Sequence, residues 1–154
     1  MTDAGFDASL SWGEPTCRVF VLCDFAQVRA GLLFISSGGV TRFLSARYPA
    51  NLNVYAAVVI EGAPFRLAEG FEVKLSLLTE DGQNVGQIAG GVQVGPARTE
   101  PGELLQTPLA LPLHPVLLPH PGRYAVRLSV EKFGIEDSLS FVALGPQQSP
   151  EGQD

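Results

Sequence analysis

The sequence predicts an all-β protein, a single-domain β-sandwich of about eight antiparallel strands with no significant helix. Three observations lead to this fold class. Apolar residues alternate with polar ones in several short stretches and occupy both faces of two others, as they do in strands. Turn signals made of glycine, proline and aspartate recur about every ten residues, a spacing typical of sandwiches. No convincing helical pattern is present, and strands with one polar face favour two packed sheets.

The length of 154 residues suits one domain. We divide the chain into an acidic leader (residues 1–15), the sandwich domain (residues 16–144) and a flexible polar tail (residues 145–154). Hydrophobic residues make up 45% of the sequence, which argues against general disorder. A domain of this size buries about 70% of its unfolded surface, so it needs no metal or disulfide to fold. We therefore expect no cofactor.

The net charge of −6 limits the classes of partner. Only Lys74 and Lys132 are lysines, and the eight arginines are scattered. Nucleic acids and anionic membranes are bound by concentrated basic surfaces, so neither is expected here. No segment approaches the roughly 20 apolar residues of a membrane span, and the N-terminal stretch lacks the positive charge and apolar run of a secretory signal.

The first strand is predicted at 17–26, CRVFVLCDFA, with apolar residues on both faces. Such a strand is covered on both sides. Cys17 and Cys23 fall on one face about 20 Å apart, too far for a disulfide. Two unpaired, buried thiols fit a reducing compartment, so we expect a cytoplasmic protein.

The end of this strand carries Asp24, whose carboxylate must find hydrogen-bond donors in an apolar setting. We expect it to accept backbone N–H groups of a turn at 27–31, which includes Gly31. A short apolar run at 32–35 follows and ends at two glycines, which suit a turn or bulge before an extended stretch at 40–45.

The middle of the chain predicts three strands. Residues 52–60 are apolar on both faces, whereas residues 71–77 alternate apolar with polar after a loop at 61–69. Asp81 and Gly82 supply the strongest hairpin signal, because Asp-Gly accepts the positive φ of a tight turn. The returning strand at 85–94 is interrupted by two glycines, which predict a bulge at 90–91.

The last third begins with a proline-rich segment at 96–121, predicted to be an edge strand that runs into an extended loop. Gly122 then opens a clean alternation over 124–130, and a final strand covers 139–143. The Pro-Gly-x-Tyr sequence that ends at Tyr124 resembles the start of a late strand in immunoglobulin-like sandwiches, in which a tyrosine ties the corner between the sheets. This motif favours an immunoglobulin-like fold.

Several of these short motifs together resemble a widespread uncharacterised bacterial family of single-domain β-sandwich proteins. The residues that carry the resemblance are Cys23, Asp24, Phe25, Gly31, Leu33, Leu77, Leu78, Asp81, Gly82, Pro121, Gly122 and Tyr124. The chain departs from the family pattern at Leu32, where lysine is usual, and at Thr79 and Glu80. The resemblance implies a fold and no activity.

The functional hypothesis is a non-enzymatic protein-interaction or scaffold module. The outward faces of the first two long strands carry more apolar residues than a single core requires. An exposed apolar patch of this kind marks an interface, often that of a symmetric dimer. The candidate interface residues are Phe20, Leu22, Tyr55, Val59 and Trp12. The alternative is that the leader or the proline-rich loop covers these positions. Trp12 itself either lies back on the domain or docks onto a partner.

A second hypothesis is a small-ligand or carbohydrate-binding sandwich with a concave site near Tyr48 and residues 36–39. An enzyme is the least favoured reading. It would need His114 or His120 to converge with Asp24 or Glu103, and the sequence has no nucleophile motif.

Overall fold

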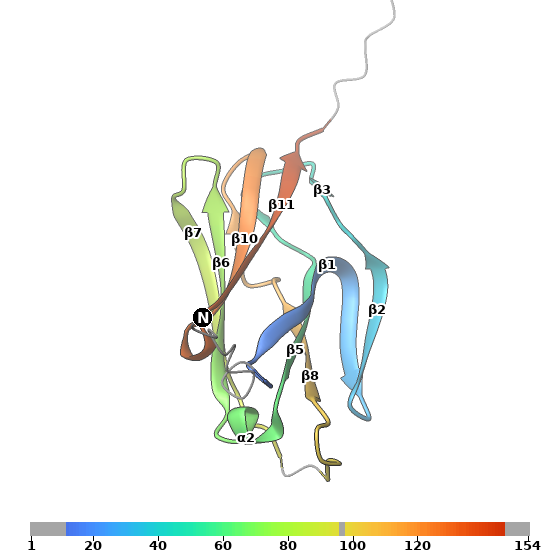
Figure 1. The fold of residues 1–154 in the computed structure, drawn as a ribbon. Helices are drawn as coiled ribbons and strands as arrows, with labels where there is room; N and C mark the ends of the chain where they lie inside the picture. Colours follow the sequence, from blue (N-terminus) through green and yellow to red (C-terminus); the bar gives the residue numbers. More distant parts are fainter. Residues whose placement is uncertain (1–11, 96–97, 147–154) are drawn as a thin grey trace, which may run out of the picture.

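A computed structural model describes residues 12–95 and 98–146 of the chain (Figure 1). The predictions for the leader before residue 12 and for the tail after residue 146 lie outside the described residues. The elements are β1 (Thr16–Arg29), β2 (Leu32–Gly38), β3 (Arg42–Leu44), β4 (Ala50–Asn51), β5 (Tyr55–Gly62), α2 (Pro64–Leu67), β6 (Phe71–Thr79), β7 (Asn84–Val92), β8 (Leu105–Pro112), β9 (Leu117–Leu118), β10 (Gly122–Val130), the 3₁₀ turn η1 (Glu131–Phe133) and β11 (Ile135–Leu144). The predicted all-β class is confirmed.

Two sheets pack face to face, as Figure 1 shows. The four-stranded sheet has the order β2-β1-β5-β8, and the five-stranded sheet has the order β3-β11-β10-β6-β7. The short strands β4 and β9 form a separate pair. All pairings are antiparallel except that of β3 with β11. The immunoglobulin-like connectivity stays a prediction.

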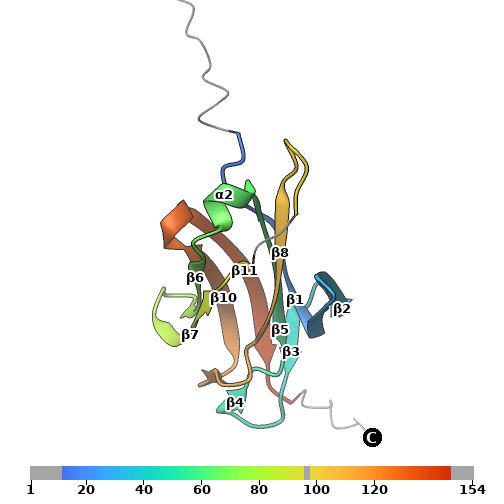
Figure 2. The same cartoon turned by 90° about the horizontal axis from the view of Figure 1, so that it is seen from below.

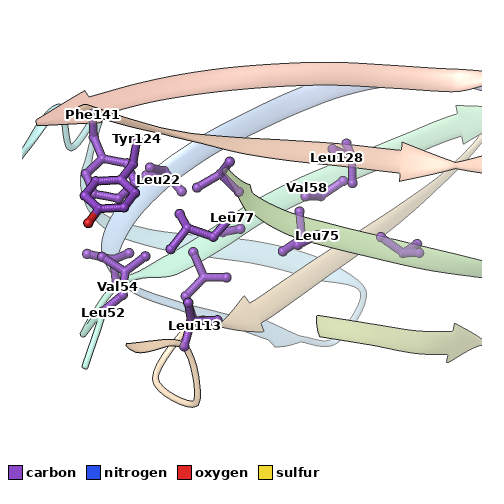
Figure 3. Close-up of a cluster of buried hydrophobic side chains, with 14 of the residues drawn as sticks. Leu22, Leu52, Val54, Val58, Leu75, Leu77, Leu113, Tyr124, Leu128 and Phe141 are labelled. Carbon is purple, nitrogen blue, oxygen red and sulfur yellow. The ribbon is translucent and has the colours of Figure 1, made fainter. Parts of the chain in front are cut away.

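The core lies between these sheets (Figure 3). The alternation predicted for β6 and β10 is confirmed, because every second side chain of each strand is buried. These side chains are Phe71, Val73, Leu75, Leu77, Tyr124, Val126, Leu128 and Val130. They meet Val58 and Ile60 of β5 and Leu22 of β1 from the opposite sheet. The clean period of two in the sequence therefore located the buried face of the five-stranded sheet correctly.

Tyr124 lies near the start of β10, where the sequence predicts a tyrosine that ties the corner between the sheets. Its ring stacks on Phe141 with centroids 5.6 Å apart, and its hydroxyl donates a hydrogen bond to the carbonyl of His120, four residues upstream. Burial raises the pKa of the Tyr124 hydroxyl, because ionisation would place a charge in this apolar setting. The side chain thus joins the loop before β10 to the core.

The hairpin between β6 and β7 forms at Asp81 and Gly82, as predicted. Gly82 has a φ of 81°, and the N–H of Thr79 donates to the carbonyl of Gln83 at 2.9 Å. The bulge predicted at 90–91 is wrong, since both glycines pair in regular register with β6. The irregularity lies instead next to the hairpin, between Leu77 and Leu78.

The proline-rich segment supplies β8, which is the edge strand that the sequence predicts. Pro108 lies opposite Val59, and Pro112 lies opposite Tyr55. Because proline has no backbone N–H, β8 is poorly suited to accept a further strand on its free side. The loop predicted at 61–69 contains one helical turn, α2, which Pro64 begins.

The face assignment for the first strand is wrong in two respects. The pairing of β1 with β5 shifts register between Cys17 and Val19, so Cys17 packs against the main core while Cys23 lies on the other side of the sheet. Phe20 and Leu22, predicted to face outward, both pack in the main core. Leu22, which is 2% exposed, is seen there in Figure 3. A bulge of this kind moves every following side chain to the opposite face.

Candidate interaction surface

The strand β1 belongs to two pairings in succession. Its first part pairs with β5 up to Cys23, and from Cys23 to Arg29 it pairs with β2. Figure 1 shows that β1 arches over between these parts and descends with β2 beside it, on the side of the four-stranded sheet that faces away from β6 and β10. Figure 2 shows the same pair standing out beyond β5 and β8. We call residues 24–38 the arm.

The arm covers part of the outer face of the four-stranded sheet. A second apolar cluster forms there from Cys23, Ala26 and Ala57, which are buried, with Val21, Leu33, Tyr55 and Ala110 packed against them. Ala26 and Leu33 come from the arm, whereas Ala57, Tyr55 and Ala110 come from β5 and β8. The apolar outer face that the sequence predicts is therefore covered by the continuation of β1 itself.

In this arrangement the candidate interface residues predicted from the sequence do not form an exposed patch. Phe20 and Leu22 are core residues, Val59 is only 8% exposed, and Tyr55 is half-buried between Phe25 and His114, with ring centroids 5.2 Å and 5.1 Å away. Trp12 remains exposed and stacks on Phe65 at 6.5 Å. The five residues do not form one exposed surface.

A different apolar surface lies on the arm. Half of the ten large hydrophobic side chains that are exposed in the described part of the chain belong to these fifteen residues, with exposures between 41% and 64%. They are Phe25, Leu32 and Phe34 on one face of the hairpin and Val28 and Ile35 on the other, and we call them together the arm patch. Apolar side chains gathered on one projecting hairpin differ from the singly scattered hydrophobic residues of an ordinary protein surface.

The tip of the arm is a two-residue turn. Ala30 has a φ of 49° and Gly31 a φ of 74°, and two consecutive positive φ values define the type I′ turn that suits the twist of a hairpin. Gly31 is thus a turn residue, as predicted. The turn is shorter than the predicted 27–31, because residues 27–29 continue β1 and pair with β2.

The role predicted for Asp24 is wrong. Since residues 27–29 are strand, no loop offers its N–H groups to this carboxylate. Asp24 is exposed on β1, so water can solvate the charge directly. Its clearest electrostatic effect falls on the neighbouring thiol, because its negative charge adds to burial in raising the pKa of Cys23.

The ligand site predicted near Tyr48 does not coincide with any of three hollows formed by the described residues. Tyr48 uses its hydroxyl to donate to the carbonyl of Leu144 at 2.8 Å. The hollows have volumes of about 400, 480 and 380 Å³. The first is lined by Glu72, Lys74, Ser129, Glu131 and Lys132, the second by residues around Arg123 and Ser140, and the third by residues 44–46 and 145–146. Neither Tyr48 nor any of residues 36–39 lines these three hollows.

The described residues offer neither a metal-binding cluster nor a membrane-spanning helix. Residues 12–95 and 98–146 contain no group of three or more histidine, cysteine, aspartate or glutamate side chains placed to hold a metal ion. Within the same ranges, no helix has the length and apolar character needed to cross a membrane. Of the two histidines, His114 packs edge-on against Tyr55, and His120 supplies the carbonyl that Tyr124 binds.

The comparison with protein families adds one finding. The model of a family of unknown function, DUF6941, matches residues 18–135, which include the arm and most of both sheets. The chain belongs to the DUF6941 family. The expectation of an uncharacterised family is thereby confirmed. None of the curated proteins compared with the chain matches it.

The two thiols of this DUF6941 protein are free and protected in different ways. Cys23 lies beneath the arm and contacts the carbonyl of Tyr55 at 3.6 Å, while Cys17 donates to the carbonyl of Val19 at 3.3 Å. Burial is the main cause that raises the pKa of each thiol, and the charges of Asp137 and Asp24 add to it at Cys17 and Cys23 respectively.

Stability is expected to fall as the pH rises above 9.0. An unfolded cysteine ionises at its ordinary pKa of 9.0, whereas the folded thiols hold their protons to higher pH. The contribution is therefore fully present below pH 9.0 and is lost as the pH rises through the folded pKa values. Urea unfolding at pH 7, 8, 9 and about 10 measures this fall.

The control for this measurement is the double variant Cys17→Ala and Cys23→Ala, whose stability is expected to change less over the same interval. Burial also raises the pKa values of Tyr48 and Tyr124 from 10.0, so their effect begins above that pH. An equal fall in the wild type and the double variant between pH 9 and pH 10 contradicts the prediction.

Proposed function

We propose that this DUF6941 protein is a non-enzymatic protein-interaction module of the cytoplasm and that it binds protein through the arm patch. The observation that carries the proposal is the concentration of exposed apolar side chains on the arm, since residues 24–38 hold half of those in the described chain. Such a surface is costly to leave in water and is hidden when a partner binds.

The charges around the patch support a protein partner. The arm carries one negative residue, Asp24, and one positive residue, Arg29, so it is neutral in a chain with a net charge of −6. Apolar and aromatic surface depleted of charge is typical of the centre of protein interfaces. The patch includes two phenylalanines, Phe25 and Phe34, which are about half exposed and can fill pockets on a partner.

The ionisable side chains bear on the non-enzymatic and cytoplasmic parts of the proposal. Raised pKa values are found at two thiols and two tyrosines, and burial in a packed setting is the leading cause in each case, as in a structural core. Two free, protected thiols agree with a reducing compartment. These observations support a binding role in the cytoplasm over catalysis.

Photo-crosslinking in the native cell tests the proposal. Benzoylphenylalanine is placed at Phe34 in the arm patch and, in a separate variant, at Phe65 on α2. Both residues are phenylalanines with high exposure, Phe65 at 66%, so the two probes are matched. We expect protein adducts at Phe34 that are missing at Phe65. No adduct at Phe34, or the same adducts at both positions, contradicts the proposed function.

A further inference from the structure

The free edge of β2 is unusually accessible to another strand. β2 pairs with β1 on one side only and ends the four-stranded sheet. Its sequence, LLFISSG, has no charged residue and no proline, which are the common protections of an edge strand. The opposite edge of the same sheet, β8, contains Pro108 and Pro112. The unpaired edge of β2 can therefore accept a further strand.

The turn at the tip determines which backbone groups point outward. In a type I′ hairpin the residues that flank the turn, here Arg29 and Leu32, bond to each other. The direction of the N–H and C=O groups then alternates along an antiparallel strand. The groups of Leu33 and Ile35 consequently face away from β1, where the described chain provides no neighbouring strand, whereas Ser37, with a φ of 53°, departs from the extended conformation.

The side chains of β2 make this edge self-complementary. The first half of the strand is bulky and the second half is small, ending in Ser36, Ser37 and Gly38. If a second copy lies antiparallel with its Ile35 opposite Ile35, then Phe34 lies opposite Ser36 and Leu32 opposite Gly38. Except for Ile35, which meets its own copy, each bulky residue then meets a small one, and the outward backbone groups of Ile35 in the two copies face each other.

We propose that β2 pairs with β2 of a second copy in this register and joins the two four-stranded sheets into one. This inference rests on the proposed function and names the partner of the arm patch. A two-fold axis at Ile35 gives the isologous contact that most homodimers use. No charge on β2 opposes its like, so the contact places no like charges opposite each other in a chain whose net charge is −6.

The exposed phenylalanines complete the contact. Phe25 of β1 lies directly opposite Ser36 of β2, and in the proposed register Phe34 of the second copy lies on the far side of that same serine. Both rings therefore flank one small residue on one face of the joined sheet. Cross-strand aromatic pairs of this kind stabilise sheets, and the pair is repeated by the two-fold axis.

The area of the patch sets the expected strength. At about 200 Å² per phenylalanine, the two half-exposed rings offer about 200 Å² per copy, and the three aliphatic side chains add roughly as much. The sum is about half of the 800 Å² per partner of a standard stable interface. We therefore expect a reversible dimer whose population rises with concentration, rather than an obligate one.

Sedimentation of the purified chain over a wide concentration range tests the dimer. We expect the mass to rise toward twice 16.4 kDa in the wild type and to remain at one copy in Phe34→Lys. The control Leu44→Lys changes a residue of β3 that is even more exposed than Phe34 and should dimerise like the wild type. A wild type that stays monomeric at high concentration, or a dimer that Phe34→Lys leaves intact, overturns the proposal.

A cysteine pair tests the register without relying on lost binding. In the proposed dimer Ile35 faces its own copy with Cα atoms about 5.5 Å apart, which suits a disulfide. Mild oxidation should link Ile35→Cys to itself. The matched variant Leu32→Cys should not form this link, because six residues of extended strand, about 20 Å, separate Leu32 from its own copy. Equal linkage of both variants, or linkage only of Leu32→Cys, overturns the register.

The crosslinks at Phe34 separate the two proposals. Adducts with twice the mass of the chain support both the proposed function and the dimer. Adducts with a different protein, together with a monomeric wild type in sedimentation, overturn the dimer and support the interaction role. No adduct at Phe34 together with a monomeric chain overturns both.

Discussion

Replacing Leu22 with arginine is expected to unfold the domain. Leu22 lies in β1, is 2% exposed, and packs in the main core near Tyr124 and Phe141 (Figure 3). A guanidinium at this position loses its water and finds no carboxylate among the core residues, which are apolar. The penalty for such a buried charge is several kcal/mol, comparable with the total stability of about 5–15 kcal/mol of a small domain.

Circular dichroism and urea unfolding measure this effect. Thr16→Arg is the matched control, because Thr16 is an exposed residue at the start of the same strand, and we expect its stability to stay within about 0.5 kcal/mol of the wild type. Leu22→Ala should remain folded and lose about 2–5 kcal/mol through the cavity it leaves. A folded Leu22→Arg protein with wild-type stability would show that Leu22 does not face the core.

Gly70→Ala is expected to destabilise the domain by about 3 kcal/mol, the sum of a conformational cost and a steric cost. Gly70 precedes β6 and has a φ of 75°, and a Cβ atom there would lie 2.6 Å from the carbonyl oxygen of Val92. Because that oxygen belongs to the backbone, it cannot move aside without displacing the end of β7. The N–H of Gly70 also donates to Leu67 at 3.0 Å, so the local backbone is held in place.

Gly82→Ala separates these two costs. Gly82 has nearly the same φ, 81°, but a Cβ atom there meets nothing within 4 Å. We expect Gly82→Ala to cost only the conformational part, about 1–2 kcal/mol. Thermal or urea unfolding of the two variants under the same conditions gives the difference. Equal losses at the two positions would contradict the steric role assigned to Val92.

The sequence predicts β6 and β10 of the five-stranded sheet well because one face of these strands is exposed to solvent. In β10 the polar residues mark the outer face, so Tyr124 and Leu128 can only point inward. The Asp81–Gly82 hairpin is equally clear, since Gly82 accepts the positive φ of 81° that this turn requires. Where polarity labels one side of a strand, the pattern determines both the strand and its orientation.

The four-stranded sheet is harder to predict for the opposite reason. β1 is apolar on both faces. Nothing in its pattern therefore reveals the register shift between Cys17 and Val19, after which inward-facing and outward-facing positions are exchanged. The tight turn of the arm is also hidden, because Ala30 holds a positive φ that is more typical of asparagine or glycine. Which side chains the arm covers depends on the arch of β1, a tertiary feature that local sequence does not encode.

The prolines of β8 determine how far self-association can proceed. In the proposed dimer the joined sheet begins and ends with a β8 strand, and Pro108 and Pro112 interrupt the row of donors on each outer border. Growth by further strand addition along this sheet stops at that border. Once two copies meet, both β2 edges are paired and no further copy can bind there. Raising the concentration should therefore yield a closed assembly rather than a fibre.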